Sequence, residues 1–244
     1  MSVIVAKASG WYSINLDLQY PRIGVILPPS TLVGALSHSA INIYNDFDFA
    51  KKVYGAYIIF DEKTKLIVNK LQNTIRIKSK NVIRTNSSVN NYVYTNSMFI
   101  AYIVNEILDK KDAKLLIESI PTFGWNDNII QAKFIDVITS PDIKKNNYVN
   151  TYTRLENINF EELIINELMP FITKLKEDVV IRNSIKPQKI KMVLKDYAVP
   201  ITIKRSYGKS EVYTGMEKLY TKEIDTIKVG RYYIPLQSNV EVIS

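Results

Sequence analysis

The sequence lacks cysteine altogether and has a single histidine among its 244 residues. The absence of cysteine excludes disulfide bonds, thiolate zinc sites and cysteine nucleophiles. One histidine leaves a histidine-based metal site short of ligands, so no metal and no other cofactor is expected. A chain without cysteine fits best in an intracellular compartment, and we expect a cytoplasmic protein.

Long apolar runs are also missing. The longest, 53–60 and 98–104, fall far short of the ~20 residues that a spanning helix requires. The first residues lack the layout of a signal peptide, so neither secretion by that route nor a membrane partner is expected. With 46% hydrophobic and 23% charged residues, the chain can instead bury a full core, in one large or two small domains.

Basic residues exceed acidic ones by 32 to 24, and the excess is concentrated in two segments. The first basic segment, 63–105, has seven basic residues and no acidic one, and the second, 179–210, has eight against Asp196 alone. Each carries +7, which leaves −6 for the rest of a chain whose net charge is +8. Such a distribution favours a protein that holds a phosphate backbone at defined places. The alternative is a lysine-rich surface that only keeps the protein soluble.

The order of the predicted elements indicates an α+β fold. Strand patterns at 2–7 and 12–16 are interrupted at Ser9-Gly10, and helical spacing follows from Ser30 to about Tyr44. Further along the chain we expect strands at 53–60, 98–104 and 129–139 and a helix at 109–120, with Leu115, Leu116 and Ile120 inward. This βαββαβ order predicts a ferredoxin-like (RRM-like) domain over residues 1–140.

The start of the first helix is the most specific motif. Pro28 and Pro29 stiffen the approach, Ser30 and Thr31 are placed to cap the helix, and Gly34 is expected to lie close to a neighbouring strand. A capped helix start presents free N–H groups and a positive dipole end, which together form a phosphate site. The alternative is a helix start whose serine satisfies only its own backbone and whose glycine serves packing.

An insert at about 61–97 separates the second and third strands of the predicted domain and contains most of the first basic segment. Residues 74–84 alternate between isoleucine and basic side chains, as on an exposed two-stranded ribbon. Residues 86–96 are too polar to pack by themselves, so we expect a basic arm that is ordered on a partner. The alternative is an unstructured surface loop. The candidate RNA contacts of the chain are Arg22, Ser30, Thr31, Lys65, Lys70, Arg76, Lys78, Lys80, Arg84, Tyr92, Tyr94, Lys204 and Arg205.

Residues 148–244 are predicted to form a smaller C-terminal region. A helical pattern over 160–178 is interrupted at Pro170, which should kink or split the helix. The remainder has the β-branched and aromatic composition of strands, and we expect this region to pack on the first domain.

The segment PPSTLVGAL at 28–36, together with RYYIPL at 231–236, resembles the fifth family of CRISPR-associated Cas proteins, and the layout is most similar to its archaeal type I-A branch. The resemblance covers essentially the whole chain. It implies a RAMP subunit of the antiviral Cascade complex that holds the 5′ handle of the CRISPR RNA, contacts the large subunit and the terminal backbone subunit, and meets target DNA only indirectly. It also implies that residues 63–96 form a thumb along the guide RNA and that Ser30 and Thr31 lie near the handle. Related subunits of type III complexes carry similar segments, and the glycine-rich loop of the superfamily is at best vestigial here, at Gly208 and Gly215.

No catalytic constellation stands out, so a non-catalytic binder is the preferred hypothesis. His38 falls mid-helix, and the adjacent carboxylates Asp46 and Asp48, or Glu161 and Glu162, have the character of solvated surface pairs. A metal-independent endoribonuclease that matures CRISPR RNA stays an alternative, because Lys and Tyr are abundant and some relatives cleave without metal. A further alternative is a scaffold whose basic segments meet acidic protein surfaces.

Overall fold

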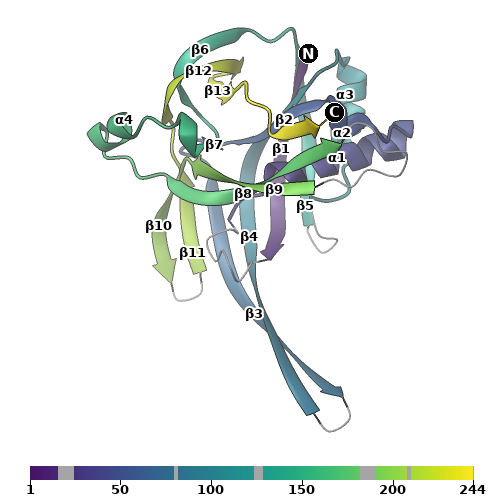
Figure 1. The fold of residues 1–244 in the computed structure, drawn as a ribbon, viewed down its shortest axis with the longest axis vertical. Helices are drawn as coiled ribbons and strands as arrows, with labels where there is room; N and C mark the ends of the chain where they lie inside the picture. The colour runs from purple at the N-terminus through teal and green to yellow at the C-terminus, as the bar shows by residue number, and fades with distance from the viewer. Residues whose placement is uncertain (16–24, 80–81, 124–128, 182–190, 208–209, 244) are drawn as a thin grey trace.

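A seven-stranded antiparallel sheet forms the centre of the fold in the computed structural model of the protein (Figure 1). Its strands lie in the order β10-β11-β3-β4-β1-β5, and β2 pairs with the second half of β4. The strands are β1 (Ser2–Asn15), β2 (Val53–Ile59), β3 (Lys65–Ser79), β4 (Val82–Val104), β5 (Ile129–Thr139), β10 (Ile201–Tyr207) and β11 (Ser210–Gly215).

The structure describes residues 1–15, 25–79, 82–123, 129–181, 191–207 and 210–243. Within its strands, only the backbone is described at 13–15, 70–79, 82–91, 178–181, 191–192, 205–207 and 241–243. Among the described residues, no helix is long and apolar enough to cross a membrane.

The continuous apolar runs at 53–59 and 98–104 lie in the middle of the sheet, as their sequence predicts. The second half of β4 pairs with β1 on one side and β2 on the other. Ile58, Ile100 and Tyr102 on these strands are fully buried. Strand 98–104 is the end of one long strand, because β4 continues through 82–97 without a break. The combination of this sheet with few, short helices confirms the α+β class.

At the interruption predicted at Ser9-Gly10, β1 continues, and its pairing with β4 contains a bulge. Ala8 pairs with Met98 but Gly10 pairs with Thr95, so β4 carries an extra residue opposite this point. Gly10 has a φ of +133°, and a Cβ there would lie 2.1 Å from the carbonyl oxygen of Ile129. Only glycine lets β5 approach β1 this closely, and β1 then continues to Asn15.

Two longer helices, α1 (Pro29–Tyr44) and α3 (Lys110–Glu118), connect the strands, and the short α2 (Phe49–Lys52) precedes β2. The hydroxyl of Ser39 on α1 donates a 2.6 Å hydrogen bond to the carbonyl of Leu116 on α3. Asp109 caps α3 by accepting from the N–H of Asp112 at 2.7 Å. The prediction that Leu115 points inward was wrong: it is 43% exposed, and Ile117 takes its place in the core.

The chain from Ile143 onward is mostly β-structure and adds two smaller sheets, in the orders β13-β12-β6 and β14-β8-β9-β7. Its elements are β6 (Ile143–Val149), β7 (Thr153–Arg154), a 3-10 turn (Leu155–Asn157), α4 (Phe160–Ile165), β8 (Phe171–Ile181), β9 (Lys191–Val199), β12 (Leu219–Val229), β13 (Tyr232–Pro235) and β14 (Val240–Ile243). Strands β10 and β11 of this region join the central sheet, so the sheet contains residues from both ends of the chain.

The helix predicted to continue beyond Pro170 is a strand instead. Helix α4 ends at Ile165, and β8 begins at Phe171. From Ile172 onward the burial alternates, with Thr173, Leu175 and Glu177 turned inward, which is the period of a strand and not of a helix. The apolar residues after Pro170 satisfy both periods over a short span, and pairing with β9 decides between them.

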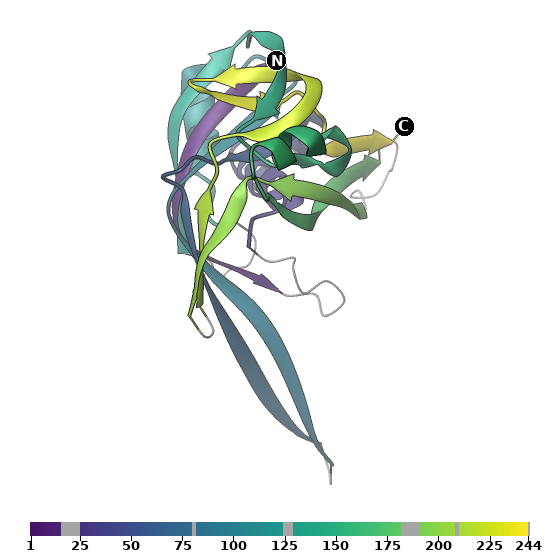
Figure 2. The ribbon, with the colours of Figure 1, turned by 90° about the vertical axis from the view of Figure 1, so that its left-hand side faces the viewer.

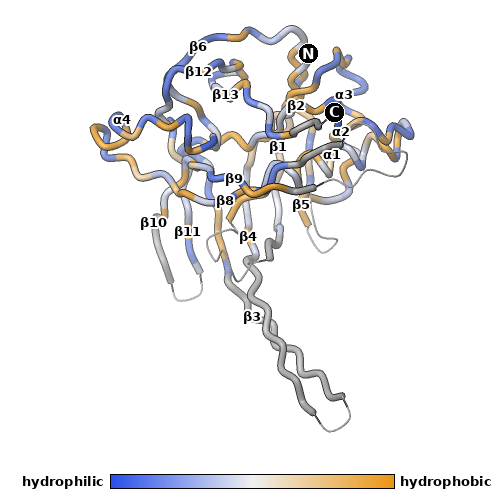
Figure 3. The backbone as a smooth tube through the Cα atoms, viewed as in Figure 1, coloured by the Kyte–Doolittle hydropathy of each residue, from blue (hydrophilic) through white to orange (hydrophobic). Residues whose placement is uncertain are grey.

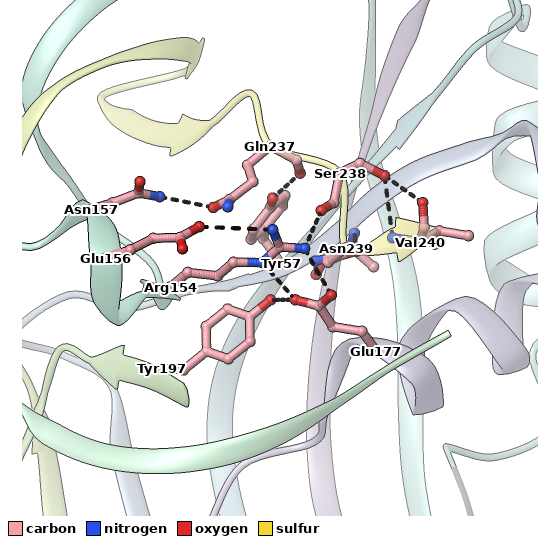
Figure 4. A network of polar contacts seen from close by, with 11 residues as sticks. Tyr57, Arg154, Glu156, Asn157, Glu177, Tyr197, Gln237, Ser238, Asn239 and Val240 are labelled. Carbon is pink, nitrogen blue, oxygen red and sulfur yellow. Dashed lines mark hydrogen bonds and ion pairs between the residues drawn. The ribbon is translucent and has the colours of Figure 1, made fainter. Parts of the chain in front are cut away.

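A buried polar network ties β7, β8, β9 and the segment before β14 together (Figure 4). Arg154 donates to both carboxylate oxygens of Glu177, at 2.9 and 2.8 Å, and to the carbonyl of Ser238 at 3.0 Å. The hydroxyl of Tyr197 also donates to Glu177. Burial raises the pKa of Tyr197, and the charge of Glu177 raises it further, so the hydroxyl stays protonated. Glu177 is 2% exposed, so its charge depends on these donors.

Candidate nucleic-acid interface

The insert forms a long two-stranded ribbon that projects from the body of the molecule (Figure 2). Its backbone pairing runs from Leu66 opposite Thr95 to Ser79 opposite Val82. The two-stranded ribbon expected around 74–84 is therefore confirmed, and it is longer than the alternation suggested. Of residues 86–96, expected to be ordered on a partner, 86–95 pair with β3 of the same chain.

The central sheet brings the last part of the second basic segment, on β10, to the root of this ribbon. Strand β11 pairs with β3 from Ser210 opposite Asn69 to Thr214 opposite Lys65. The Ser210 hydroxyl lies 2.6 Å from the side-chain oxygen of Asn69, across 141 residues of sequence. Strand β10, which carries Lys204, is the next strand outward. Lys204 and the first basic segment, far apart in the sequence, thus lie in one sheet with β11 between their strands.

The candidate contacts are distributed over this surface. Lys65 on β3 and Lys204 on β10 are exposed. The backbone places Lys70, Arg76, Lys78 and Arg84 on the ribbon and Arg205 on β10 opposite Val212. Arg22 and Lys80 lie outside the described residues.

A turn at Asp61 anchors the root of the ribbon. One carboxylate oxygen of Asp61 accepts from the N–H and the hydroxyl of Thr64, at 2.9 and 3.0 Å. The other accepts from the hydroxyl of Tyr232 at 2.7 Å and from Arg231 at 3.2 Å. Gly215, at the end of β11, donates its N–H to the carbonyl of Thr64 at 2.9 Å, and a Cβ there would lie 2.1 Å from the Asp61 carbonyl oxygen. The turn therefore joins β2, β3, β11 and β13.

Replacing Asp61 by asparagine should lower the stability at neutral pH and remove part of its acid dependence. Burial raises the pKa of the Asp61 carboxyl, but hydrogen bonds from Tyr232, from Thr64 and from backbone N–H groups outweigh it, so the pKa lies below its ordinary value. A lowered pKa in the folded state adds stability above the ordinary pKa, which is lost as the pH falls through the folded value. We expect Asp61→Asn to cost ~1–3 kcal/mol at pH 7 and less at about pH 3, by urea unfolding.

Asp142→Asn is the matched control, because Asp142 forms an exposed ion pair with Lys144 at 2.8 Å. That replacement should change the free energy of unfolding by less than ~1 kcal/mol at either pH. An Asp61→Asn protein with the same pH dependence as the unmodified chain would contradict the role of this carboxylate.

The start of α1 differs from its prediction. Pro28 is the residue before the first turn, no side chain caps the helix, and the N–H groups of Thr31 and Leu32 bond to the Pro28 carbonyl at 3.0 and 3.3 Å. Pro29 takes the first helical position, which suits its missing N–H and fixed φ, so Ser30 lies inside the helix and is 8% exposed. The capping role of Ser30 was therefore wrong, while the contact of Ser30 and Thr31 with a phosphate stays a prediction.

Gly34 does not serve close packing. A Cβ at this position would meet no atom within 4 Å, and the residue is exposed on α1. The prediction that Gly34 admits a neighbouring strand was wrong, because the face of α1 that packs inward is carried by Leu32, Val33 and Leu36.

The two candidate tyrosines lie on β4 near the ribbon root and are half-buried. Tyr94 stands next to Trp11 of β1, with ring centroids 5.0 Å apart and planes inclined by 47°. Trp11 is 41% exposed and was not among the sequence-based candidates. The sequence signal that indicates Trp11 is the alternation along β1. Lys7, Ser9 and Trp11 lie on the exposed face of this strand, while Ala8 and Tyr12 are buried.

The residues considered for catalysis or metal binding do not come together in one site. His38 is exposed on α1, and its Nδ1 lies 3.2 Å from the amide nitrogen of Asn42. Asp46 pairs with Lys52 at 2.8 Å, and Asp48 pairs with Lys51 at 2.7 Å. Within the described ranges, no group of three or more His, Asp or Glu side chains is placed to hold a metal ion. Glu161 and Glu162 lie in the first turn of α4.

No known protein family matches the sequence, and no curated protein is significantly similar to it. Among solved structures, the chain is similar to a CRISPR protein from Archaeoglobus fulgidus, with a TM-score of 0.48 and 9% identity over 96% of this chain and 98% of that one. It is also similar to a chain of the type III-B Cmr-beta complex bound to cognate target RNA and AMPPnP, with a TM-score of 0.39 and 13% identity over 88% and 86% of the two chains. Both TM-scores lie below 0.5, so these likenesses do not by themselves assign a fold or a function.

Proposed function

We propose that the chain is a non-catalytic RNA-binding subunit of a type I CRISPR Cascade complex, which holds the 5′ handle of the CRISPR RNA. The observation that carries the proposal is the pairing of β3 with β11. Through this pairing, Lys204 and Arg205 of the second basic segment lie on β10 in the same sheet as the first basic segment, with β11 between them. A polyanion that follows the ribbon to its root meets Lys65 and then Lys204, both exposed. Contacts of this kind supply most sequence-independent affinity for nucleic acids.

The strand order supports a ferredoxin-like core. Four strands of the central sheet lie side by side in the order β5-β1-β4-β2. Along the chain, α1 connects β1 to β2, and α3 connects β4 to β5. This is the arrangement expected of a βαββαβ domain of the RRM-like type. The ribbon then occupies the position where the resemblance to the fifth Cas family places a thumb, between the second and third strands.

The absence of a suitable acid–base pair among the candidates supports binding without cleavage. Metal-free RNA cleavage requires a base at the 2′-hydroxyl and an acid at the leaving oxygen. His38 is exposed on α1, and its Nδ1 lies 3.2 Å from the amide nitrogen of Asn42, which is not the carboxylate that would orient a catalytic base. Tyr57, Tyr102 and Tyr152 are fully buried, where no RNA reaches them.

Hydrophobic residues follow one another on and after α4 (Figure 3), and their exposure supports assembly with protein subunits. Ile164, Ile165 and Met169 are 74–83% exposed. Exposed apolar groups that cluster in this way are typical of protein contact sites. The backbone and large subunits of the complex are the partners that the resemblance implies.

Purification of the tagged chain from its own cells tests the proposal. We expect small RNAs that share a common 5′ end, together with CRISPR-associated proteins. Incubation of the purified chain with repeat RNA in EDTA should give bound, uncleaved RNA. Site-specific cleavage that is lost in a His38→Ala or a Lys/Tyr variant would overturn the non-catalytic assignment, and assembly of the complex without RNA would favour a scaffold.

A further inference from the structure

A row of apolar side chains crosses the central sheet at the root of the ribbon. Trp11 on β1 lies directly opposite Ile129 on β5 and Tyr94 on β4. Tyr94 in turn lies opposite Ile67 on β3. Residues that are directly opposite in a sheet project from the same face. These four side chains therefore form one line on one face, here called the outer row.

Three of the four side chains of the outer row are exposed to solvent, Tyr94 is half-buried, and none belongs to the core. Ile129 is 73% exposed, Trp11 41% and Ile67 38%, whereas the alternate residues Tyr12 and Val93 are fully buried on the opposite face. Further up the same face, Phe99 is covered by Tyr232 of β13, with ring centroids 6.3 Å apart. This face of the sheet is thus covered by β13 at one end and carries exposed aromatic and aliphatic side chains at the other.

Lysines border the outer row. Lys7 and Lys133 lie directly opposite each other, four residues along their strands from Trp11 and Ile129. Lys65 lies two residues from Ile67 on the same face of β3. All three lysines are exposed, and the positions between them on β1 and β5 are the polar Ser9 and Gln131. The described positions of this face that neighbour the outer row carry no carboxylate.

We propose that the outer row binds unpaired bases of single-stranded RNA, with a base stacked on the Trp11–Tyr94 pair and the bordering lysines at its phosphates. Aromatic side chains on the central strands of an open sheet, next to cationic groups, are the arrangement that holds splayed bases. A row one residue wide between lysines matches a polyanion with apolar bases better than a protein surface, which needs a broader apolar patch. The inference rests on the proposed function, because RNA led along the ribbon reaches the outer row at Ile67.

The test is the affinity of a Trp11→Ala variant for oligouridine, measured against an RNA duplex. Loss of a stacking partner should weaken oligouridine binding by about 5- to 150-fold and leave duplex binding unchanged. The slope of log affinity against log salt should not change, since stacking releases no counterions. Trp11→Phe should retain most of the affinity. Phe47→Ala is the matched control, because Phe47 is an exposed aromatic outside the sheet, 69% exposed.

A second readout follows the tryptophan itself. The chain has two tryptophans, Trp11 and Trp125, so a Trp125→Phe variant reports Trp11 alone. Oligouridine should quench its emission, and quenching should saturate at the same concentration as binding. Salt-dependent RNA binding that is unchanged in Trp11→Ala, without quenching, would overturn this inference and leave the proposed function intact. Failure of the unmodified chain to bind any RNA would overturn both. Loss of a protein partner in Trp11→Ala, with unchanged RNA affinity, would assign the row to that partner instead.

Discussion

Replacing Arg76, Lys78, Lys80 and Arg84 by alanine is expected to weaken RNA binding on the order of 10²- to 10³-fold at about 0.1 M salt. Each phosphate contact on a single strand contributes ~0.7 to the slope of log affinity against log salt, and ~0.9 on a duplex. Four lost contacts therefore remove a large part of the electrostatic affinity. Equilibrium binding of a repeat-derived RNA, followed by fluorescence anisotropy, measures the change. The two strands of the ribbon should stay paired, because the pairing uses backbone groups that the replacements leave in place. The isoleucines and polar residues that alternate with the replaced positions are also kept.

A variant of equal charge change provides the control. Lys110 and Lys111 on α3, Lys145 on β6 and Lys228 on β12 are all exposed and lie outside the ribbon. Their replacement by alanine lowers the net charge by the same four units but removes no predicted contact. An equal loss of affinity in the two variants would mean that net charge alone governs binding, and that the ribbon has no special part in it.

Replacing Arg154 by alanine is expected to have the largest effect on stability, about 3–5 kcal/mol. The replacement removes both hydrogen bonds to the carboxylate of Glu177, which is 2% exposed, and leaves that charge buried without a cationic partner. The network joins β7, β8 and β9, so its loss should open the sheet β14-β8-β9-β7. Urea unfolding followed by circular dichroism gives the free energy of unfolding.

The contrast with an exposed pair makes this prediction specific. Lys144 and Asp142 form an ion pair at 2.8 Å in which both side chains are about 60% exposed, so Lys144→Ala should cost less than ~1 kcal/mol. The double replacement Arg154→Met with Glu177→Leu should recover much of the loss, because it leaves no buried charge. Equal costs for Arg154→Ala and Lys144→Ala would refute the importance of the buried network.

Local sequence patterns predicted the elements in which apolar residues recur regularly, or run continuously, over many positions. The strand at 129–139 and the buried strands at 53–59 and 98–104 follow directly from their apolar sequence. The pattern failed where tertiary pairing decides. Phe171, Ile172 and Leu175 fit a helix as well as a strand, and only pairing with β9, which is distant in sequence, selects the strand. The predicted cap of α1 was wrong because Pro29 takes the first helical position and Pro28 precedes it, which leaves Ser30 inside the helix.

The candidate site was predictable in charge but not in arrangement. Counting lysines and arginines located both basic segments, yet nothing local indicates that Ser210 pairs opposite Asn69. Such a contact between distant segments is set by the closure of the whole sheet. Trp11 was missed because Ser9-Gly10 suggested the end of a strand. Strand β1 instead continues through Gly10, and the extra residue of β4 opposite this point brings Tyr94 opposite Trp11.

The salt dependence of RNA binding tests the central claim most directly. The account predicts a steep negative slope of log affinity against log salt for the unmodified chain, and a slope shallower by ~0.7–0.9 for each of the ribbon cations that meets a phosphate. The four-alanine variant should therefore differ clearly from the control variant of equal charge. An unchanged slope in the ribbon variant would contradict the claim that the arm lies on RNA.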